Sequence, residues 1–195
     1  NEGFPWLSGR TIKIGAAETL AIRVNFVGEL GWEIHSPIET QNYIFDQLME
    51  AGSDLGIKPF GIRAMDSLRI EKSYRLIGTE LSIEYAGYES GLDRFIHPNK
   101  GEFIGRDALV EWREKGFDNS FVTLEVHGVE DADALGNNPI YSNGEVIGRA
   151  TGGNYGFRTQ KSLALAMVRP KYAEIETKLQ MDILGKMHDV TVIPE

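Results

Sequence analysis

The sequence predicts an α+β unit followed by a small all-β barrel. Over residues 1–116, apolar residues recur at helical spacing in three stretches, and short alternating stretches near the start predict strands. After residue 121 the apolar residues alternate in steps of two, with turn sequences such as Gly136–Asn137 and Asn143–Gly144 between them. Roughly five or six short strands at that spacing are typical of a small barrel or sandwich. We expect the barrel over residues 119–195, joined to the first unit by a short linker.

The first elements are predicted to be antiparallel strands. Residues 11–14 form a short strand, and a second strand begins at residues 20–26, is interrupted at Gly28 and Gly31, and resumes to His35. Isolated glycines in a strand indicate a bulge or the close approach of another group.

The resumed half of that strand places a carboxylate beside a glycine. Side chains alternate between the faces of a strand, so Gly31, Glu33 and His35 share one face. An ionised carboxylate accepts two parallel N–H bonds, and a flat, nitrogen-rich ring fits where Gly31 lacks a side chain. The alternative is a β-hairpin with a solvated Glu33. The opposite face carries Leu30, Trp32 and Ile34.

Three helices are predicted from apolar spacing. They span residues 40–55, ending at Gly56, residues 62–74, and residues 106–115, ending at Gly116. The second helix also carries charged positions that can pair with one another: Asp66, Arg69, Glu71 and Arg75. The strands after residue 121 are expected to be held by the apolar residues Val122, Leu124, Val126, Ile140, Val146, Ile147, Leu163, Leu165, Met167, Leu179, Met181, Ile183, Val190 and Val192.

Composition and motifs exclude several functions. The net charge of −9 argues against nucleic acid or an anionic membrane as a partner, because phosphate binding needs a basic surface. There is no cysteine, hence no disulfide or thiolate metal site, and no apolar run of about 18 residues to span a membrane. The four histidines are scattered and no serine nucleophile motif is present, so no metal centre is expected. Because G-x-G-x-x-G is absent, this chain is not expected to hold a flavin or nicotinamide.

The stretch GELGWE, Gly28 to Glu33, is followed by GIRAMDSLRIEKSYR, Gly61 to Arg75. Together they resemble the tetrahydrofolate-binding domain of the glycine-cleavage T-protein (aminomethyltransferase) superfamily. The resemblance covers nearly the whole chain and is strongest to the C-terminal half of sarcosine and dimethylglycine dehydrogenases. It implies the C-terminal part of a T-protein-like folate-binding domain over residues 1–116 and a C-terminal β-barrel domain over residues 119–195. A fragment of a longer protein is therefore expected.

The resemblance also names candidate binding residues. Glu33 is the second Glu of the family's GExGxE motif, which binds the pterin ring of folate. Glu29 is the first, and we interpret it as mostly structural, anchoring the turn. Tyr74 matches a tyrosine that stacks on or hydrogen-bonds to the ligand in some members; the alternative is packing at the helix end. Trp32 is the fourth candidate, although its in-phase neighbours favour a core position.

This sequence departs from the family's pattern in two places, and both indicate which branch of the family it resembles. The T-protein subgroup carries a folate-contacting Arg where this chain has Met65, and the dehydrogenase branch commonly lacks it. Arg63 lies on another face of the helix, so the role is not transferred to it. Iron–sulfur maturation relatives carry a cysteine near the loop that contains Lys100, and this chain has none.

In the dehydrogenase branch a flavin domain oxidises an N-methylamine to an iminium, and the folate domain captures the one-carbon unit as methylenetetrahydrofolate. The resemblance thus implies tetrahydrofolate as cofactor, FAD on an upstream domain and a methylated amine as substrate. The family's reactive Asp lies upstream of GExGxE, so no catalytic residue is assigned, and these residues alone are expected to be inactive. We expect an upstream flavin domain or self-association, and a cytoplasmic location, or the mitochondrial matrix in a eukaryote.

Two other functions stay open. One is a folate-dependent demethylase acting on an S- or O-methyl substrate, and the other is a non-catalytic folate-binding or scaffold module. An upstream dinucleotide-binding motif would favour the dehydrogenase type over the demethylase, and a measurement of folate affinity separates both from a scaffold.

Overall fold

A computed structural model describes residues 2–195, which form two compact units. The N-terminal unit extends to Leu68, and the C-terminal unit runs from Arg69 to Glu195. Helix α2, Ile62–Ile70, crosses this division. The domain boundary expected near residues 116–119 stays a prediction.

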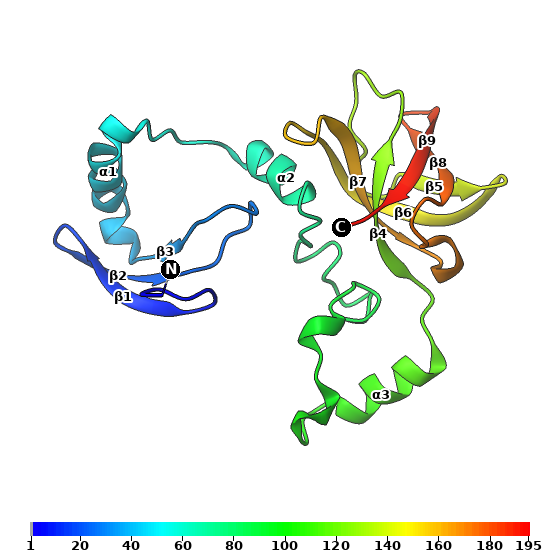
Figure 1. The fold of residues 1–195 in the computed structure, drawn as a ribbon, viewed down its shortest axis with the longest axis horizontal. Helices are drawn as coiled ribbons and strands as arrows, with labels where there is room; N and C mark the ends of the chain where they lie inside the picture. The colour runs from blue at the N-terminus through cyan, green and yellow to red at the C-terminus, as the bar shows by residue number, and fades with distance from the viewer. Residues whose placement is uncertain (1) are drawn as a thin grey trace. The chain divides into compact units, whose positions relative to one another are not determined.

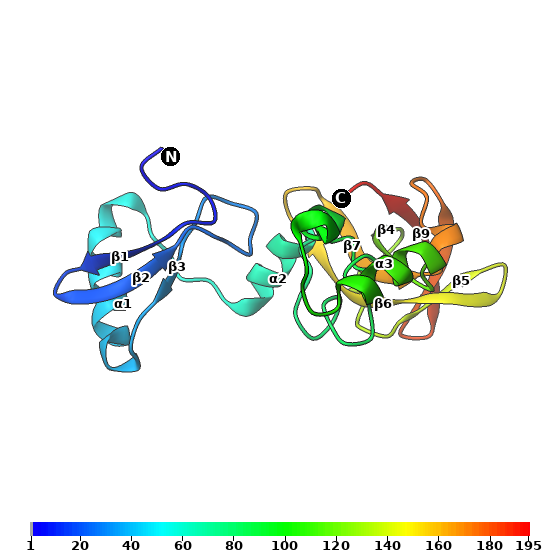
Figure 2. The same ribbon diagram turned by 90° about the horizontal axis from the view of Figure 1, so that it is seen from below.

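The N-terminal unit is built on a three-stranded antiparallel sheet. Strands β1 (Gly9–Ile14), β2 (Ala17–Ile22) and β3 (Glu33–His35) lie in the order β1-β2-β3. The 3-10 turns η1 (Ile38–Thr40) and η2 (Ser53–Leu55) flank helix α1 (Gln41–Ala51), which lies along one side of the sheet (Figure 2). The Tyr43 hydroxyl of α1 accepts a hydrogen bond from the backbone N–H of Ala16 at 2.9 Å, which ties the helix to the β1–β2 turn.

The predicted second strand is shorter than expected. Strand β2 ends at Ile22, and residues 23–32 form a loop before β3. Within this loop Gly28 has a left-handed backbone with φ of 70°, and Asn25 Oδ1 accepts a bond from the N–H of Val27 at 3.3 Å. The left-handed backbone at Gly28 and the side-chain turn at Asn25 both interrupt an extended strand. Residues 23–32 therefore do not take part in the β2–β3 ladder. Gly31 therefore does not share a strand face with Glu33, and that prediction was wrong.

The three predicted helices are present with one shortened end. Helix α1 and its flanking 3-10 turns cover the first predicted helix, residues 40–55. This segment ends at Gly56, whose backbone is left-handed. Helix α3 has the expected bounds, Arg106–Lys115, and ends at Gly116. Helix α2 stops at Ile70 rather than at Tyr74.

The C-terminal unit contains a closed antiparallel barrel, which confirms the predicted fold class. Six strands follow one another around it in the order β4-β7-β6-β5-β8-β9, and β9 pairs with β4 (Figure 1). The strands are β4 (Ser120–Val126), β5 (Pro139–Ser142), β6 (Glu145–Gly156), β7 (Lys161–Val168), β8 (Lys178–Ile183) and β9 (Lys186–Ile193). Short 3-10 turns η3 (Asp93–Phe95) and η4 (Pro98–Lys100) precede α3, and η5 (Pro170–Tyr172) follows β7.

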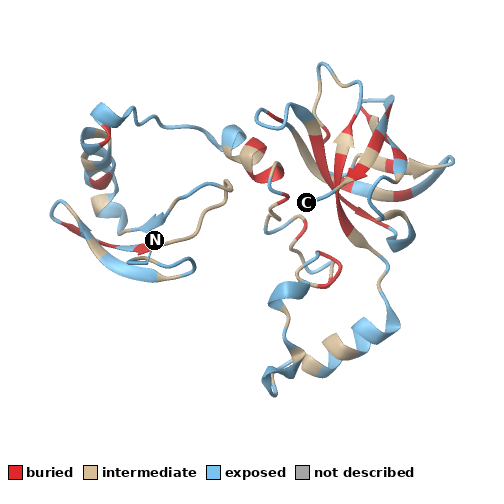
Figure 3. Ribbon diagram, in the orientation of Figure 1, coloured by how far each residue is buried: buried red, intermediate tan, exposed pale blue. Residues whose placement is uncertain are grey.

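The apolar side chains of strand β7 belong to two separate clusters of buried residues. Its small residues Ala164 and Ala166 join the interior cluster with Leu124, Ile140 and Met181. Its larger residues Leu163, Leu165 and Met167 form a second cluster with Ile70 and Phe121. All the predicted barrel residues are buried except Val146, which is 49% exposed. A six-stranded barrel has a narrow interior, so small side chains point inward where two strands approach closely. Figure 3 shows the buried residues gathered along the barrel strands.

Leu124 tests the interior packing. Its side chain is fully buried in the barrel cluster, so Leu124→Ala removes contacts and leaves a cavity. We expect the free energy of unfolding to fall by roughly 2–5 kcal/mol. Urea denaturation measures this loss. Val146→Ala, at an exposed position of the same barrel, is the control and is expected to change stability by less than about 0.5 kcal/mol. Equal losses for the two variants would contradict the packing described here.

Candidate functional site

The predicted carboxylate lies on the uncovered face of the N-terminal sheet. Glu33 pairs with Ile22 and His35 pairs with Leu20 across the β2–β3 ladder, and directly opposed residues share a face. The alternate β2 residues Ala17, Thr19 and Ala21 are buried on the other face. The register continues from Ile22 to Gly9 on β1, so a glycine stands in the same cross-strand row as Glu33.

The Glu33 carboxylate is accessible to solvent, and the polar side chain next to it is His35. The Glu33 side chain is 51% exposed, and its Oε2 lies 3.3 Å from Nε2 of His35. Beside this pair Leu20 is 41% exposed. The row therefore offers a carboxylate next to an apolar surface, which suits a planar ligand with adjacent N–H groups.

The other two candidates of the N-terminal unit, Glu29 and Trp32, lie close to Glu33 in sequence. Glu29 is exposed in the loop before β3. Trp32 is 45% exposed and packs edge-on against Phe4, with ring centroids 6.1 Å apart, so its predicted core position is wrong. The expected alternation failed because residues 23–32 are not a strand.

Tyr74, in the C-terminal unit, lies in a turn after α2. Ser73, directly before it, has a left-handed backbone with φ of 52°, which ends the helical path. The Ser73 hydroxyl is 2.6 Å from that of Thr123 on β4, and both residues are buried. The carbonyl oxygen of Tyr74 accepts a bond from Nη1 of Arg69 at 3.0 Å.

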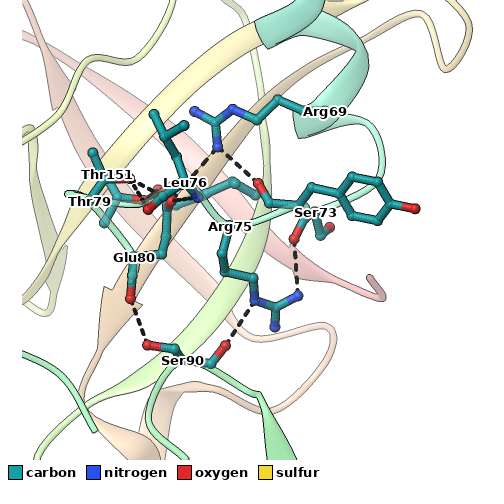
Figure 4. Close-up of polar contacts among 10 residues, drawn as sticks. Arg69, Ser73, Arg75, Leu76, Thr79, Glu80, Ser90 and Thr151 are labelled. Carbon is teal, nitrogen blue, oxygen red and sulfur yellow. Dashed lines mark hydrogen bonds and ion pairs between the residues drawn. The ribbon is translucent and has the colours of Figure 1, made fainter. Parts of the chain in front are cut away.

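Glu80 is the centre of a buried polar cluster beneath this turn. It is 0% exposed, and its Oε2 accepts bonds from the N–H of Leu76 at 2.8 Å and from the Thr79 hydroxyl at 2.6 Å. Its Oε1 accepts a bond from the Thr151 hydroxyl of β6. The guanidinium of Arg69, itself only 4% exposed, lies 3.8 Å from the carboxylate (Figure 4). Every carboxylate oxygen thus has a donor, as a buried charge requires.

A small cleft adjoins this cluster within the C-terminal unit. It encloses about 240 Å³, and its lining includes Thr79, Thr151, Tyr85 and Arg149. Arg149 donates to the Tyr85 hydroxyl at 2.7 and 3.0 Å and forms an ion pair with Glu84. The Tyr85 hydroxyl and the Glu84 carboxylate raise the pKa of Arg149 above its ordinary value. The cation is therefore already compensated within the cleft, and no ligand is assigned to it.

The sequence pattern does not reveal the long-range contacts that several residues of the second helix and the turn after it make. Arg69, Glu71 and Arg75 were interpreted only as charge pairs of one helix. In the structure Arg75 binds Glu195 with both Nη atoms, and Glu71 accepts bonds from the N–H groups of Arg158 and Thr159. These contacts join residues 87 or more positions apart, so local spacing carries no signal for them. Among residues 2–195, no group of three or more acidic or histidine side chains is placed to hold a metal, and no helix is long and apolar enough to cross a membrane.

Comparison with known proteins places the fold in a family. The family model of the GCVT N-terminal domain matches residues 1–100, and that of the glycine cleavage T-protein C-terminal barrel domain matches residues 119–195. The chain belongs to the glycine cleavage T-protein family.

Two types of curated relative match nearly the whole chain. Human mitochondrial dimethylglycine dehydrogenase is 36% identical over 193 residues, which cover 98% of this chain and 22% of that protein. The aminomethyltransferase of Caldanaerobacter subterraneus subsp. tengcongensis is 34% identical over 182 residues, covering 90% of this chain and 46% of that protein. The chain therefore spans less than half the length of these relatives.

A solved structure shares the fold. The glycine cleavage system aminomethyltransferase T from Bartonella henselae matches with a TM-score of 0.87 at 22% sequence identity. The match covers 100% of this chain and 53% of that one.

The burial of the Glu80 carboxylate generates a stability prediction. Glu80→Ala removes the carboxylate that lies beside the buried guanidinium of Arg69, so we expect the free energy of unfolding to fall by roughly 3–5 kcal/mol. The control is Glu84→Ala, which breaks an ion pair whose two side chains are 60% and 44% exposed and should cost less than about 1 kcal/mol. Chemical denaturation of both variants makes the comparison. A Glu80→Ala loss no larger than that of Glu84→Ala would show that the buried pair is not stabilising.

Proposed function

We propose that this chain is the tetrahydrofolate-binding part of a one-carbon-transfer enzyme. In this proposal it captures the one-carbon unit of an N-methylamine of the sarcosine or dimethylglycine type as methylenetetrahydrofolate. The observation that carries the proposal is the Glu33 carboxylate on the uncovered face of the N-terminal sheet. The dimethylglycine dehydrogenase relatives, which match almost the whole chain, support this substrate type over others.

The surroundings of Glu33 fit the pterin ring of a reduced folate. The ring presents two adjacent N–H groups, and a carboxylate can accept both because it is planar and carries two acceptor oxygens. Leu20 and Ile22, the neighbours of His35 and Glu33 in the ladder, supply apolar surface for the flat ring. Gly9, beyond Ile22, leaves that part of the sheet without a side chain.

The chemistry of the folate is the capture of an activated one-carbon unit by a ring nitrogen, and the chain's own part is to bind and orient the ring. Orientation of the reacting partners is itself a large contribution to rate. We assign no catalytic residue to these 195 residues. In this proposal an upstream domain holds FAD and generates the iminium, a division that the greater length of the dehydrogenase relatives supports. The names of these relatives give a mitochondrial location. We propose the same location for this chain if its source is eukaryotic, and the cytoplasm if its source is bacterial.

Glu33→Gln tests the proposed contact. The amide offers one acceptor oxygen and no charge, so the charge-assisted pair of bonds is lost. We expect a loss of roughly 1.5–3 kcal/mol, which is a drop of about tenfold to a hundredfold in tetrahydrofolate affinity. Calorimetric titration of the full-length protein measures it.

Glu29→Gln is the matched control, because it removes the other motif carboxylate from an exposed loop position. It should bind like the wild type. Loss of affinity in Glu29→Gln alone would identify the wrong carboxylate. Unchanged affinity in both variants would leave Glu33 as a solvated side chain, and a wild type without folate affinity would favour a scaffold module.

The exposed apolar side chains of the N-terminal unit generate a second prediction. Leu20, Leu30 and Trp32 are each 41–65% exposed within a short stretch of the chain, and clustered apolar exposure favours association. We expect the 195-residue chain to self-associate, and Leu30→Ser with Trp32→Ser to weaken this. Sedimentation velocity over a concentration series checks it; a wild-type monomer at all concentrations would refute the expectation.

A further inference from the structure

The row of residues that contains Glu33 lies at one end of the N-terminal sheet. Glu33 is the first residue of β3, Ile22 is the last of β2 and Gly9 is the first of β1. Ile22 pairs with both of the others across the ladder. The uncovered face therefore extends from Glu33 in one direction only, away from the loop of residues 23–32 and toward the β1–β2 turn. Figure 2 shows helix α1 along one side of these three strands.

The side chains of the uncovered face change from acidic to apolar to basic along that direction. The gap at Gly9 is bordered by apolar side chains, because a methyl group there would lie 3.6 Å from Cδ1 of Leu20 and 3.7 Å from Cγ1 of Ile22. Leu20 belongs to the next row of this face, and Lys13 pairs with Glu18 in the row after it. A flat group can therefore lie over the gap and the apolar row, with an ammonium group beyond its far end.

Lys13 is available to a ligand. It is exposed, as is Glu18, and no ion pair joins these two directly opposed residues in the described part of the chain. Among the strand residues that the register places on this face, Lys13 is the one lysine or arginine; they are Gly9, Thr11, Lys13, Glu18, Leu20, Ile22, Glu33 and His35. An anion that reaches this end of the face therefore meets Lys13.

The separation of Glu33 and Lys13 is comparable to the length of an extended reduced folate. Two strand spacings of about 4.8 Å and four residues at about 3.4 Å each place their Cα atoms about 17 Å apart. A reduced folate carries the pterin N–H groups at one end, an aminobenzoyl ring in the middle and two glutamyl carboxylates at the other end. The flexible four-carbon stem of a lysine lets its ammonium group adjust to the position of a carboxylate. The order of groups along the ligand thus complements the order of side chains along the face.

We propose that Lys13 binds the glutamyl carboxylates of a reduced folate whose pterin ring lies at Glu33. This inference rests on the proposed function, and it assigns the other end of the same ligand. The ligand then crosses the uncovered face diagonally, from β3 over Leu20 to β1, within the N-terminal unit alone. Because the contact is an exposed ion pair, it adds a modest increment of affinity and selects folates over pterins that lack a glutamyl group.

A cycle that removes the charge from the protein and from the ligand tests the proposal. The two ligands are tetrahydrofolate and its diamide, in which both glutamyl carboxylates are carboxamides, and each is titrated under argon into the full-length protein. The wild type is expected to bind the diamide roughly threefold to fivefold more weakly than tetrahydrofolate, the range of an exposed ion pair. Lys13→Gln is expected to bind both ligands as weakly as the wild type binds the diamide, because either change removes the same contact. Lys13→Arg keeps the charge and should keep the preference for tetrahydrofolate.

Lys58→Gln is the matched control. Lys58 is an exposed lysine of the same unit that lies outside the three strands, so its loss changes the net charge equally without altering the uncovered face. This variant should bind both ligands like the wild type. Added salt should reduce the preference of the wild type for tetrahydrofolate, because it screens exposed charges.

Three results would overturn the proposal: equal affinities of the wild type for the two ligands, a preference for tetrahydrofolate that survives in Lys13→Gln, or an equal loss of that preference in Lys58→Gln. If Glu33→Gln nevertheless weakens the binding of both ligands, the proposed function stands and only the role of Lys13 is rejected. A wild type that binds neither ligand would reject the proposed function and the role of Lys13 together.

Discussion

The buried carboxylate of Glu80 is the interaction on which the arrangement of the C-terminal unit depends. It forms an ion pair with Arg69 at the end of α2, and its hydrogen-bond donors come from Leu76 and Thr79 in the following turn and from Thr151 on strand β6. An ionised group in a dry interior is tolerated only while its partners stay in place. These segments are therefore expected to keep their arrangement or lose it together. The backbone carbonyl of Glu80 extends the same cluster by accepting a bond from the Ser90 hydroxyl at 2.6 Å.

This cluster explains why the compact unit begins at Arg69, well before the barrel strands. Ile70 packs with Phe121, Leu165 and Met167, so the end of α2 covers apolar side chains of β4 and β7. Glu71 holds the backbone of the β6–β7 turn through Arg158 and Thr159. The segment before the barrel is thus attached to it by both apolar and polar contacts.

Much of the barrel and of the helices was predictable from the sequence because the signals are local. Alternation marks β4, β8 and β9, and Gly116 marks the end of α3 within a residue. The loop of residues 23–32 was not predictable in this way, since an apolar stretch interrupted by glycines has the composition of a strand. The side of β7 on which Leu163 and Leu165 lie also depends on the narrow barrel interior rather than on their spacing.

The candidate site was predicted in part, and for a partly wrong reason. Glu33 does lie on an open strand face, but the glycine that shares its row is Gly9 through Ile22, not Gly31. That row depends on strand register, which a single strand does not reveal. Glu80 and Arg69 were missed because a buried ion pair between an α2 residue and the turn beyond it leaves no repeating pattern.

The central claim is that Glu33 recognises the pterin ring, and a crystal structure of the full-length protein with tetrahydrofolate tests it most directly. The account predicts that the two carboxylate oxygens of Glu33 lie within about 3.2 Å of two adjacent ring nitrogens, the distance of an N–H···O hydrogen bond. A bound folate whose ring nitrogens meet a different carboxylate, with Glu33 facing solvent, would contradict it.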